Sequence, residues 1–448
     1  MKRTIITCCA FLCYVTLAAQ PASTDSLLMR YRQMALEYND DLKAAVRNIE
    51  ASMELERAAR ADRTPTLSAG ADFKYTGNPL ELSAELPGVG PLTFEGQDLN
   101  YGASVTLLQP VYTGGRIIEA IRLAESQTLV AEAEQELLHS SVCYQVDVQY
   151  WTAVARYELM TVADEFLRSV TDLERIVRER VEAGAADRQE LLTVEVKRNE
   201  AEYRCLQAEN DFKVGLMALN SLVGLPLDNA TPVGEQVAAV DGAAGPDTSP
   251  VGRPTPGEGA AVADNSLLRP ELRIAEERIG MARSSMRLND AQYKPQLYVG
   301  ANGGFYAPGY DFRPDLSPNY SLYAQVSVPI FHGGKRRREK RAYTYRVDMA
   351  TDFLQKERLA VELETATART SFAEAERRVA LAHSSLSKAE ENERRATEKY
   401  EEGAISIADV IDAQVYRQTA QTNHVAAKAA VQLHWAELLK AVNGYTVR

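Results

Sequence analysis

Three segments of the chain alternate between apolar and polar residues. One begins after Pro65, and two lie between Pro295 and Pro329. A period of two predicts β-strands, and about 10 residues is the length of a tilted strand that crosses an outer membrane. The same alternation also fits a small soluble sheet packed on helices. The apolar positions are Leu67, Ala69, Ala71 and Phe73, then Leu297, Val299, Ala301 and Phe305, then Leu322, Ala324, Val326 and Val328.

A second pattern predicts very long helices. No glycine or proline occurs between Gly115 and Gly184, and a helix of roughly 65 residues would be about 100 Å long. Apolar residues recur there about every 3.67 positions, a period that leaves helices nearly straight. Straight helices can form the staves of a tube, whereas a strict heptad would favour a two-stranded coiled coil. The recurring residues are Tyr144, Val148, Trp151, Ala155, Leu159, Val162, Phe166, Val170, Leu173 and Val177.

Both patterns occur twice along the chain. A glycine pair begins at Gly114 and another at Gly333, and each is followed 70 positions later by a glycine that breaks the helical run, Gly184 or Gly403. Helical patterns at 27–61 and 272–293 precede the strands of each half. The first half carries 11 extra residues, which we place in an exposed loop at 78–97. One architecture is therefore built twice.

The strand count has a consequence for assembly. Two strands in each half give four in the chain, and four strands cannot close a barrel. Open strand edges are not tolerated in lipid. If the strands lie in a membrane, several copies of the chain must share one barrel.

The N-terminus has the pattern of a secretory signal peptide. Lys2 and Arg3 precede an apolar run that ends in small residues and is too short to span a bilayer. The residues before Cys13 are not the small ones that lipidation needs. We expect a signal peptide at 1–20, a first repeat at 21–226, an irregular connector at 227–263 and a second repeat at 264–448.

Charge and motif content exclude several classes of protein. The chain has 62 acidic and 50 basic residues, a net charge of −12, which argues against nucleic-acid binding. The five histidines are scattered, and no catalytic or phosphate-binding motif occurs, so we expect no enzyme, metal or cofactor. Cys143 and Cys205 are expected to pack as small apolar side chains, with a disulfide between them as the alternative.

In order and spacing, these features resemble the TolC-like outer membrane efflux protein family. The resemblance covers nearly all of the mature chain. It rests on Pro-Val-Tyr-x-Gly-Gly-Arg at 110–116 and Pro-Ile-Phe-x-Gly-Gly-Lys at 329–335, on Leu-Val-Gly-Leu-Pro at 222–226, and on Leu-Arg-Pro-Glu-Leu at 268–272. The helix-break segments at 182–184 and 399–403, with Asp-Val-Ile-Asp-Ala at 409–413, complete it.

The resemblance implies a fold that is mainly α with a membrane β-barrel. Internally duplicated long helices would form an α-helical barrel in the periplasm. Four strands per protomer would complete a 12-stranded barrel in outer membrane lipid as a homotrimer. The protein would be the outer membrane channel of a tripartite efflux or type I secretion system, docked to a periplasmic adaptor protein and an inner-membrane pump. The alternative is a periplasmic coiled-coil scaffold without a channel.

The resemblance also assigns candidate site residues. Asp409 and Asp412 resemble carboxylates that narrow the periplasmic aperture, and Tyr400 resembles a tyrosine that holds it closed. Glu190 occupies the matching place in the first half. Ser406 with Asp409, and Asp187 with Glu190, also have capping-box spacing, so capping is the competing role and is favoured for Glu190. Asp412 has no capping role and is the first choice for a pore ring.

Two more surfaces are candidates for contacts. The breaks at Gly184-Ala185 and Gly403-Ala404 would be helix-hairpin tips on which the adaptor docks. A basic cluster at 335–341 follows the last strand. It fits anionic lipid head groups and equally a solvated helix start. Ile405 stands where some family members have a basic residue that ties the closed aperture.

Overall fold

The computed structural model describes residues 24–79, 81–86, 88, 90–238, 265–309 and 315–445. The predicted signal peptide and most of the predicted connector lie outside these residues. The chain divides into two compact units. The first contains Met1–Asn39, His139–Val262 and Ala366–Tyr445, and the second contains Asp40–Leu138, Ala263–Thr365 and Thr446–Arg448. Each unit draws on both halves of the chain, and the predicted repeat boundaries stay a prediction.

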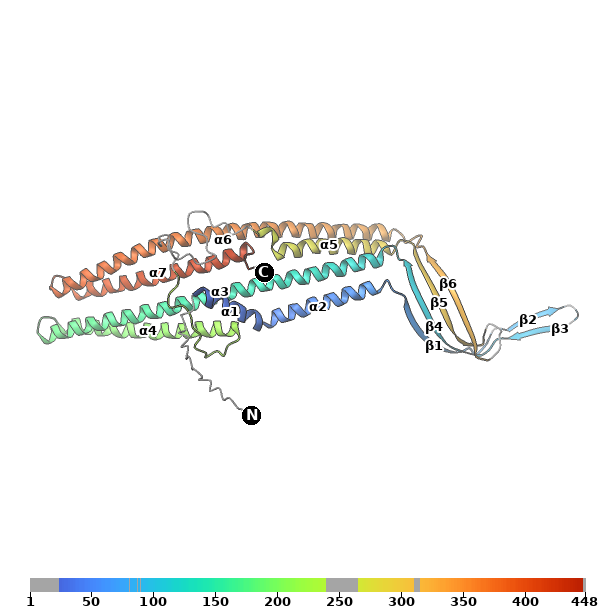
Figure 1. The fold of residues 1–448 in the computed structure, drawn as a ribbon, viewed down its shortest axis with the longest axis horizontal. Coiled ribbons are helices and arrows are strands. Elements are labelled where there is room, and N and C mark those ends of the chain that lie inside the picture. The colour runs from blue at the N-terminus through green and yellow to red at the C-terminus, as the bar shows by residue number, and fades with distance from the viewer. Residues whose placement is uncertain are drawn as a thin grey trace, which may run out of the picture. The chain divides into compact units, whose positions relative to one another are not determined.

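Long helices dominate the fold, as the sequence predicts (Figure 1). The helix α3 (Arg116–Glu182) and the helix α6 (Lys335–Glu401) have 67 residues each. Each is followed by a shorter helix, α4 (Arg188–Val223) or α7 (Ile407–Ala441). The equal lengths follow from the equal spacing of the glycines in the two halves. Among the described residues, no helix combines the length and hydrophobicity that crossing a bilayer requires.

The N-terminal helical pattern is interrupted, which the sequence did not indicate. The structure has α1 (Thr24–Tyr38) and α2 (Asp40–Ala61) in place of one helix at 27–61. Asn39 lies between them. Asparagine competes with the helix through its own side-chain hydrogen bonds, and Asp40 and Asp41 favour a new helix start. The matching helix of the second half is α5 (Pro270–Ala291), preceded by a short 3-10 turn, Ser266–Leu268.

Unit 1 is held together by a buried polar cluster as well as by apolar packing. Asp147 is 2% exposed and accepts two hydrogen bonds from Arg32, at 2.6 and 2.5 Å. The Tyr445 hydroxyl also donates to Asp147 at 2.5 Å. This cluster joins α1, α3 and the C-terminal segment. Residues 227–238, the described part of the predicted connector, contain no helix or strand and pack on the helices: Val237 is buried, and its N–H donates to Glu158 at 2.9 Å.

Unit 2 contains a four-stranded antiparallel sheet. Its strands are β1 (Thr66–Tyr75), β4 (Leu99–Tyr112), β5 (Gln296–Ala307) and β6 (Ser317–Ser327), in the order β1-β4-β5-β6. Sheet and long helices together confirm the predicted fold class. The predicted loop at 78–97 is wrong in part, because it forms a second hairpin of β2 (Glu81–Leu86) and β3 (Gly90–Glu95).

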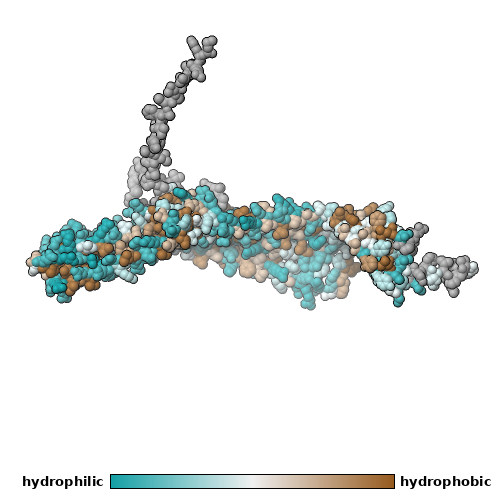
Figure 2. Space-filling model, turned by 90° about the horizontal axis from the view of Figure 1, so that it is seen from below, coloured by the Kyte–Doolittle hydropathy of each residue, from teal (hydrophilic) through white to brown (hydrophobic). Residues whose placement is uncertain are grey.

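The register separates the sheet into an apolar and a polar face. One row across the four strands is Leu67, Leu107, Ala301 and Leu322, and the next is Ser68, Thr106, Asn302 and Ser321. The alternation predicted for the segments that form β1, β5 and β6 is therefore in phase, and β4 shares it. Leu67 and Leu322 are 71% and 80% exposed. Figure 2 shows hydrophobic residues gathered over this part of the surface.

Candidate functional site

The candidate aperture lies in unit 1, where α3 meets α4 and α6 meets α7. The helices α3 and α6 end in the same way. Gly184 and Gly403 have φ of 73° and 76°, a left-handed conformation that glycine adopts without steric cost. The N–H of Ala185 donates to the Arg180 carbonyl, and that of Ala404 to the Lys399 carbonyl, each at 2.8 Å. This is a Schellman motif, so the two predicted breaks are confirmed as equivalent turns.

The next helix of each hairpin begins with a side-chain cap, but the two caps differ. Ser406 and Asp409 form a complete capping box: the Asp409 carboxylate accepts from the Ser406 N–H at 3.0 Å and from its hydroxyl at 2.7 Å. In the first hairpin Asp187 accepts from the Gln189 N–H at 3.4 Å. Glu190 does not complete a box there, and its carboxylate is engaged by another residue.

That residue is Tyr400, whose hydroxyl donates to Glu190 at 3.0 Å. The tyrosine is 3% exposed and lies within an apolar cluster that includes Val177 and Val410. Burial, and then the hydrogen bond to Glu190, raise the pKa of Tyr400 to about 12. Tyr400 therefore stays a neutral donor at physiological pH and connects the end of α6 to the start of α4.

Arg180 completes this contact, and the sequence analysis missed it. Its guanidinium lies 4.7 Å from the centre of the Tyr400 ring. It also donates to the carbonyls of Tyr400, at 2.8 Å, and Glu401, at 3.3 Å. These are the last carbonyls of α6, where the helix dipole favours a cation. The one local signal was a basic residue in the last turn of α3. Ile405, in the place of the family's basic residue, packs against the apolar cluster.

Asp409 and Asp412 both lie exposed on the first turns of α7. The hydrogen bonds from Ser406 hold the pKa of Asp409 below its usual value, so this carboxylate stays ionised. Asp412 makes no hydrogen bond or ion pair with the described residues. The two aspartates are three positions apart and share one helix face. The four tip residues Gly184, Ala185, Gly403 and Ala404 are exposed too.

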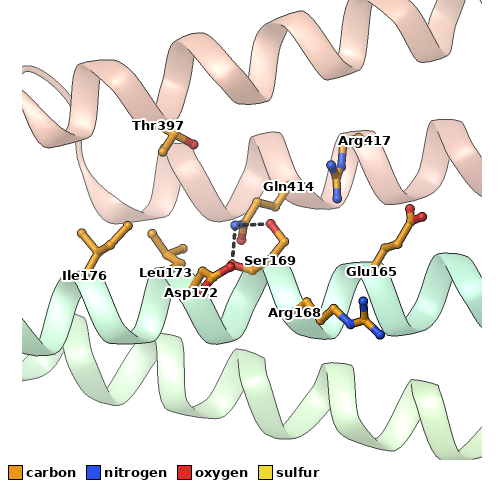
Figure 3. A pocket seen from close by; sticks show the side chains of 9 residues that line it. All are labelled: Glu165, Arg168, Ser169, Asp172, Leu173, Ile176, Thr397, Gln414 and Arg417. Carbon is orange, nitrogen blue, oxygen red and sulfur yellow. Dashed lines mark hydrogen bonds between the residues drawn. The ribbon is translucent and has the colours of Figure 1, made fainter.

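A polar cavity of about 390 Å³ opens beside this cluster, lined by α3, α6 and α7 (Figure 3). Gln414 donates to the Ser169 carbonyl at 3.3 Å and to its hydroxyl at 2.9 Å. The Ser169 hydroxyl donates to Glu393 at 3.1 Å, and Arg417 pairs with the same carboxylate at 2.8 Å. The cavity wall is thus cross-linked from three helices. These pairs tie the helices together, which is the arrangement of a structural contact.

Histidine and cysteine side chains do not assemble a further site in the described part of the chain. The rings of His383 and His424 lie 5.5 Å apart, a pair that sequence spacing did not reveal. No three metal-ligating residues come together among the described residues. Cys143 and Cys205 are free, so the alternative of a disulfide is wrong. Burial raises the pKa of the Cys143 thiol to about 11.

Known proteins are similar to this chain in sequence and in fold. The model of the family described as outer membrane efflux protein matches residues 31–225 and 265–444. Solvent efflux pump outer membrane protein SrpC of Pseudomonas putida is 26% identical over 70% of this chain, and the match spans only 63% of SrpC. Alkaline protease secretion protein AprF of Pseudomonas aeruginosa is 24% identical over 75% of this chain and 67% of its own length.

A solved structure of the outer-membrane channel OprN has the same fold. It superposes with a TM-score of 0.76 at 17% identity and covers 93% of this chain and 90% of that one. Fold and family model agree with the resemblance carried by the glycine pairs and the helix breaks. The chain therefore belongs to the outer membrane efflux protein family.

Proposed function

We propose that this protein is the outer membrane channel of a tripartite efflux or type I secretion system. It would conduct substrates from an inner-membrane pump and a periplasmic adaptor across the periplasm and the outer membrane. The similarity to SrpC, named as a solvent efflux pump protein, and to AprF, named as a protease secretion protein, supports both kinds of system. The role is transport, and no enzymatic function is proposed.

The observation that carries the proposal is the two-faced sheet with two open edges. The apolar row through Leu67 and Leu322 is exposed, as a lipid-facing surface must be. β1 and β6 are the edge strands and have unpaired backbone groups. Hydrocarbon offers these groups no partner. Three copies that pair β1 of one with β6 of the next would close a barrel of 12 strands, with the polar face inside.

The resting channel is proposed to be sealed by the residues around Gly403. Three copies of Asp412, with Asp409 beside it, would form a ring of negative charge that favours cations over anions. Asp409 caps α7 at the same time. The contact of Tyr400 with Glu190 and Arg180 would hold the two hairpins of each protomer together in the closed state.

The adaptor is proposed to dock on the exposed tips. Gly184 with Ala185 and Gly403 with Ala404 form equivalent turns, so a trimer would present six similar tips to the adaptor. Small side chains at these turns leave the backbone accessible to a partner helix. Six of the residues 335–341 at the start of α6 are basic, and the seventh is Glu339. Arg336 pairs with Asp290 at 2.8 Å and Lys335 with Glu339 at 3.5 Å, and the other exposed basic residues fit anionic head groups at the membrane surface.

Reconstitution tests the channel directly. The purified protein should require detergent, migrate as a trimer and produce single-channel currents in a planar lipid bilayer. Currents should be cation-selective at neutral pH because of the aspartate ring. A protein that stays soluble without detergent and yields no current would be the periplasmic scaffold instead.

A further inference from the structure

Two tyrosines on the polar face of the sheet lie over glycines of the neighbouring strand. A Cβ atom on Gly300 of β5 would lie 2.3 Å from Tyr323 Cζ and 2.5 Å from its hydroxyl oxygen, closer than any real contact. A Cβ atom on Gly102 of β4 would lie 2.6 Å from Tyr306 Cδ1. Neither glycine has a positive φ. At Gly300 the ring alone therefore occupies the place of a side chain, and at Gly102 the Phe305 carbonyl oxygen, 3.0 Å away, adds to the ring.

Both rings lean in the same direction. Tyr323 of β6 covers a glycine of β5, and Tyr306 of β5 covers a glycine of β4, each directly opposite it in the register. The Tyr306 hydroxyl donates to Asn302 at 3.1 Å, and Asn302 in turn donates to Thr106 at 3.0 Å. Hydrogen bonds along the wall thus hold this ring flat against the sheet.

Apart from these two rings and Tyr298, this face carries polar or small side chains and Leu108, and it is uncharged over three strands. The row that contains Asn302 otherwise carries only serine and threonine side chains. On β4, β5 and β6 the described residues of this face include no charged side chain. On such a face, the large tyrosine rings determine how far the side chains project from the sheet.

We propose that Gly102 and Gly300 set the bore of the barrel by letting Tyr306 and Tyr323 lie flat. The barrel interior would then be wide and partly aromatic. Each protomer would add one acidic and one basic side chain to it, Asp72 and Lys74 of β1, whose charges offset each other, so the interior would suit bulky cargo that is not sorted by charge. The inference rests on the proposed channel function, because the polar face is a lumen only in a closed barrel. A methyl group at Gly300 would lift the Tyr323 ring into the lumen in each of the three copies.

Thiol labelling past the rings measures the bore without relying on the periplasmic aperture. Ser327→Cys places a thiol on the polar face of β6, nearer the helices than Tyr323. In a Cys205→Ser background, Cys143 is the other native thiol among the described residues, and it is buried; Cys8, Cys9 and Cys13 lie in the predicted signal peptide. Maleimide-linked polyethylene glycols of increasing size are added to intact cells. The largest reagent that labels the introduced thiol defines the size limit for each variant.

Gly300→Ala should lower this size limit, and Gly300→Ala with Tyr323→Ala should restore or raise it. Two alanine variants are matched controls. Gly70→Ala adds the same methyl group to the same face, where no atom lies within 4 Å. Gly303→Ala adds it to the apolar face, where the nearest atoms are 3.9 Å away. Both should label like the parent protein.

A size limit unchanged by Gly300→Ala overturns the inference, as does an equal drop in the two controls. If Gly300→Ala does not assemble, Tyr323→Ala alone must raise the limit, and an unchanged limit would overturn the inference just as well. If even the smallest reagent fails to label the thiol from Ser327→Cys, the polar face is not a lumen. That result would contradict the proposed channel function as well as the inference.

Discussion

Tyr400 predicts an alkaline opening of the channel. Its pKa is raised from 10.0 to about 12, so the folded protein favours the protonated hydroxyl that donates to Glu190. The contact is fully present below about pH 10 and is lost as the pH rises through about 12. An ionised Tyr400 would then repel the Glu190 carboxylate. Single-channel conductance in a planar bilayer should accordingly step upward over this range.

The control for this step is Tyr400→Phe. It keeps the aromatic ring beside Arg180 and removes only the hydroxyl. The hydrogen bond lost with it is one to a charged group, and such a bond contributes about 1.5–3 kcal/mol. The variant should be more conductive at neutral pH and should lack the alkaline step. An alkaline step of normal size in Tyr400→Phe would assign it to a different group.

The aspartates on α7 predict a second effect on conductance. Replacing Asp409 and Asp412 together by alanine removes both carboxylates from each copy, and with them the charge that attracts cations. Conductance should rise and the preference for cations should weaken. Asp352→Ala is the control. It removes an exposed carboxylate from α6, far along the chain from the two aspartates of α7, and should leave conductance and selectivity unchanged. Wild-type selectivity in the double variant would mean that these residues do not line the pore.

At the scale of elements, the hairpin tips predict where a partner binds. Ala185→Trp with Ala404→Trp adds bulk to both exposed turns without changing the glycines that form them. We expect loss of efflux in cells, measured as loss of resistance to an exported compound, with a normal yield of trimer. Serine at the same two positions is small and should preserve efflux. Full efflux by the tryptophan variant would exclude the tips as the docking surface.

The elements that the sequence predicts correctly are those whose signals are local. Helices α3 and α6 follow from long runs without glycine or proline, and the strands follow from alternation within each segment. The break at Asn39 was missed because it carries neither glycine nor proline. The β2–β3 hairpin was missed because its segment is rich in turn-forming residues. Arg180 meets Tyr400 across 220 positions of sequence, and no local pattern reports such a contact.

At the scale of the whole molecule, the sheet predicts that the trimer is the folded unit. A single chain inserted in a bilayer would leave the edges of β1 and β6 unpaired, and each unsatisfied backbone group in hydrocarbon costs several kcal/mol. An inserted monomer is therefore excluded on energetic grounds. The proposed aperture ring and the proposed set of six docking tips would form only in a trimer, so loss of assembly should remove conductance and docking together.

Two neighbouring residues of β6 separate lipid contact from lumen contact. Ala324 lies opposite Val299 on the apolar face, and Gln325 lies opposite Tyr298 on the polar face. Ala324→Arg should cost about 2–4 kcal/mol if the site is near the bilayer midplane, and the yield of heat-resistant trimer on a semi-native gel should fall. Gln325→Arg places the same charge in hydrated space and should assemble normally. Because the two sites are adjacent on one strand, general damage to the strand would lower both yields alike. Normal yields for both variants would mean that these strands do not meet lipid in this orientation.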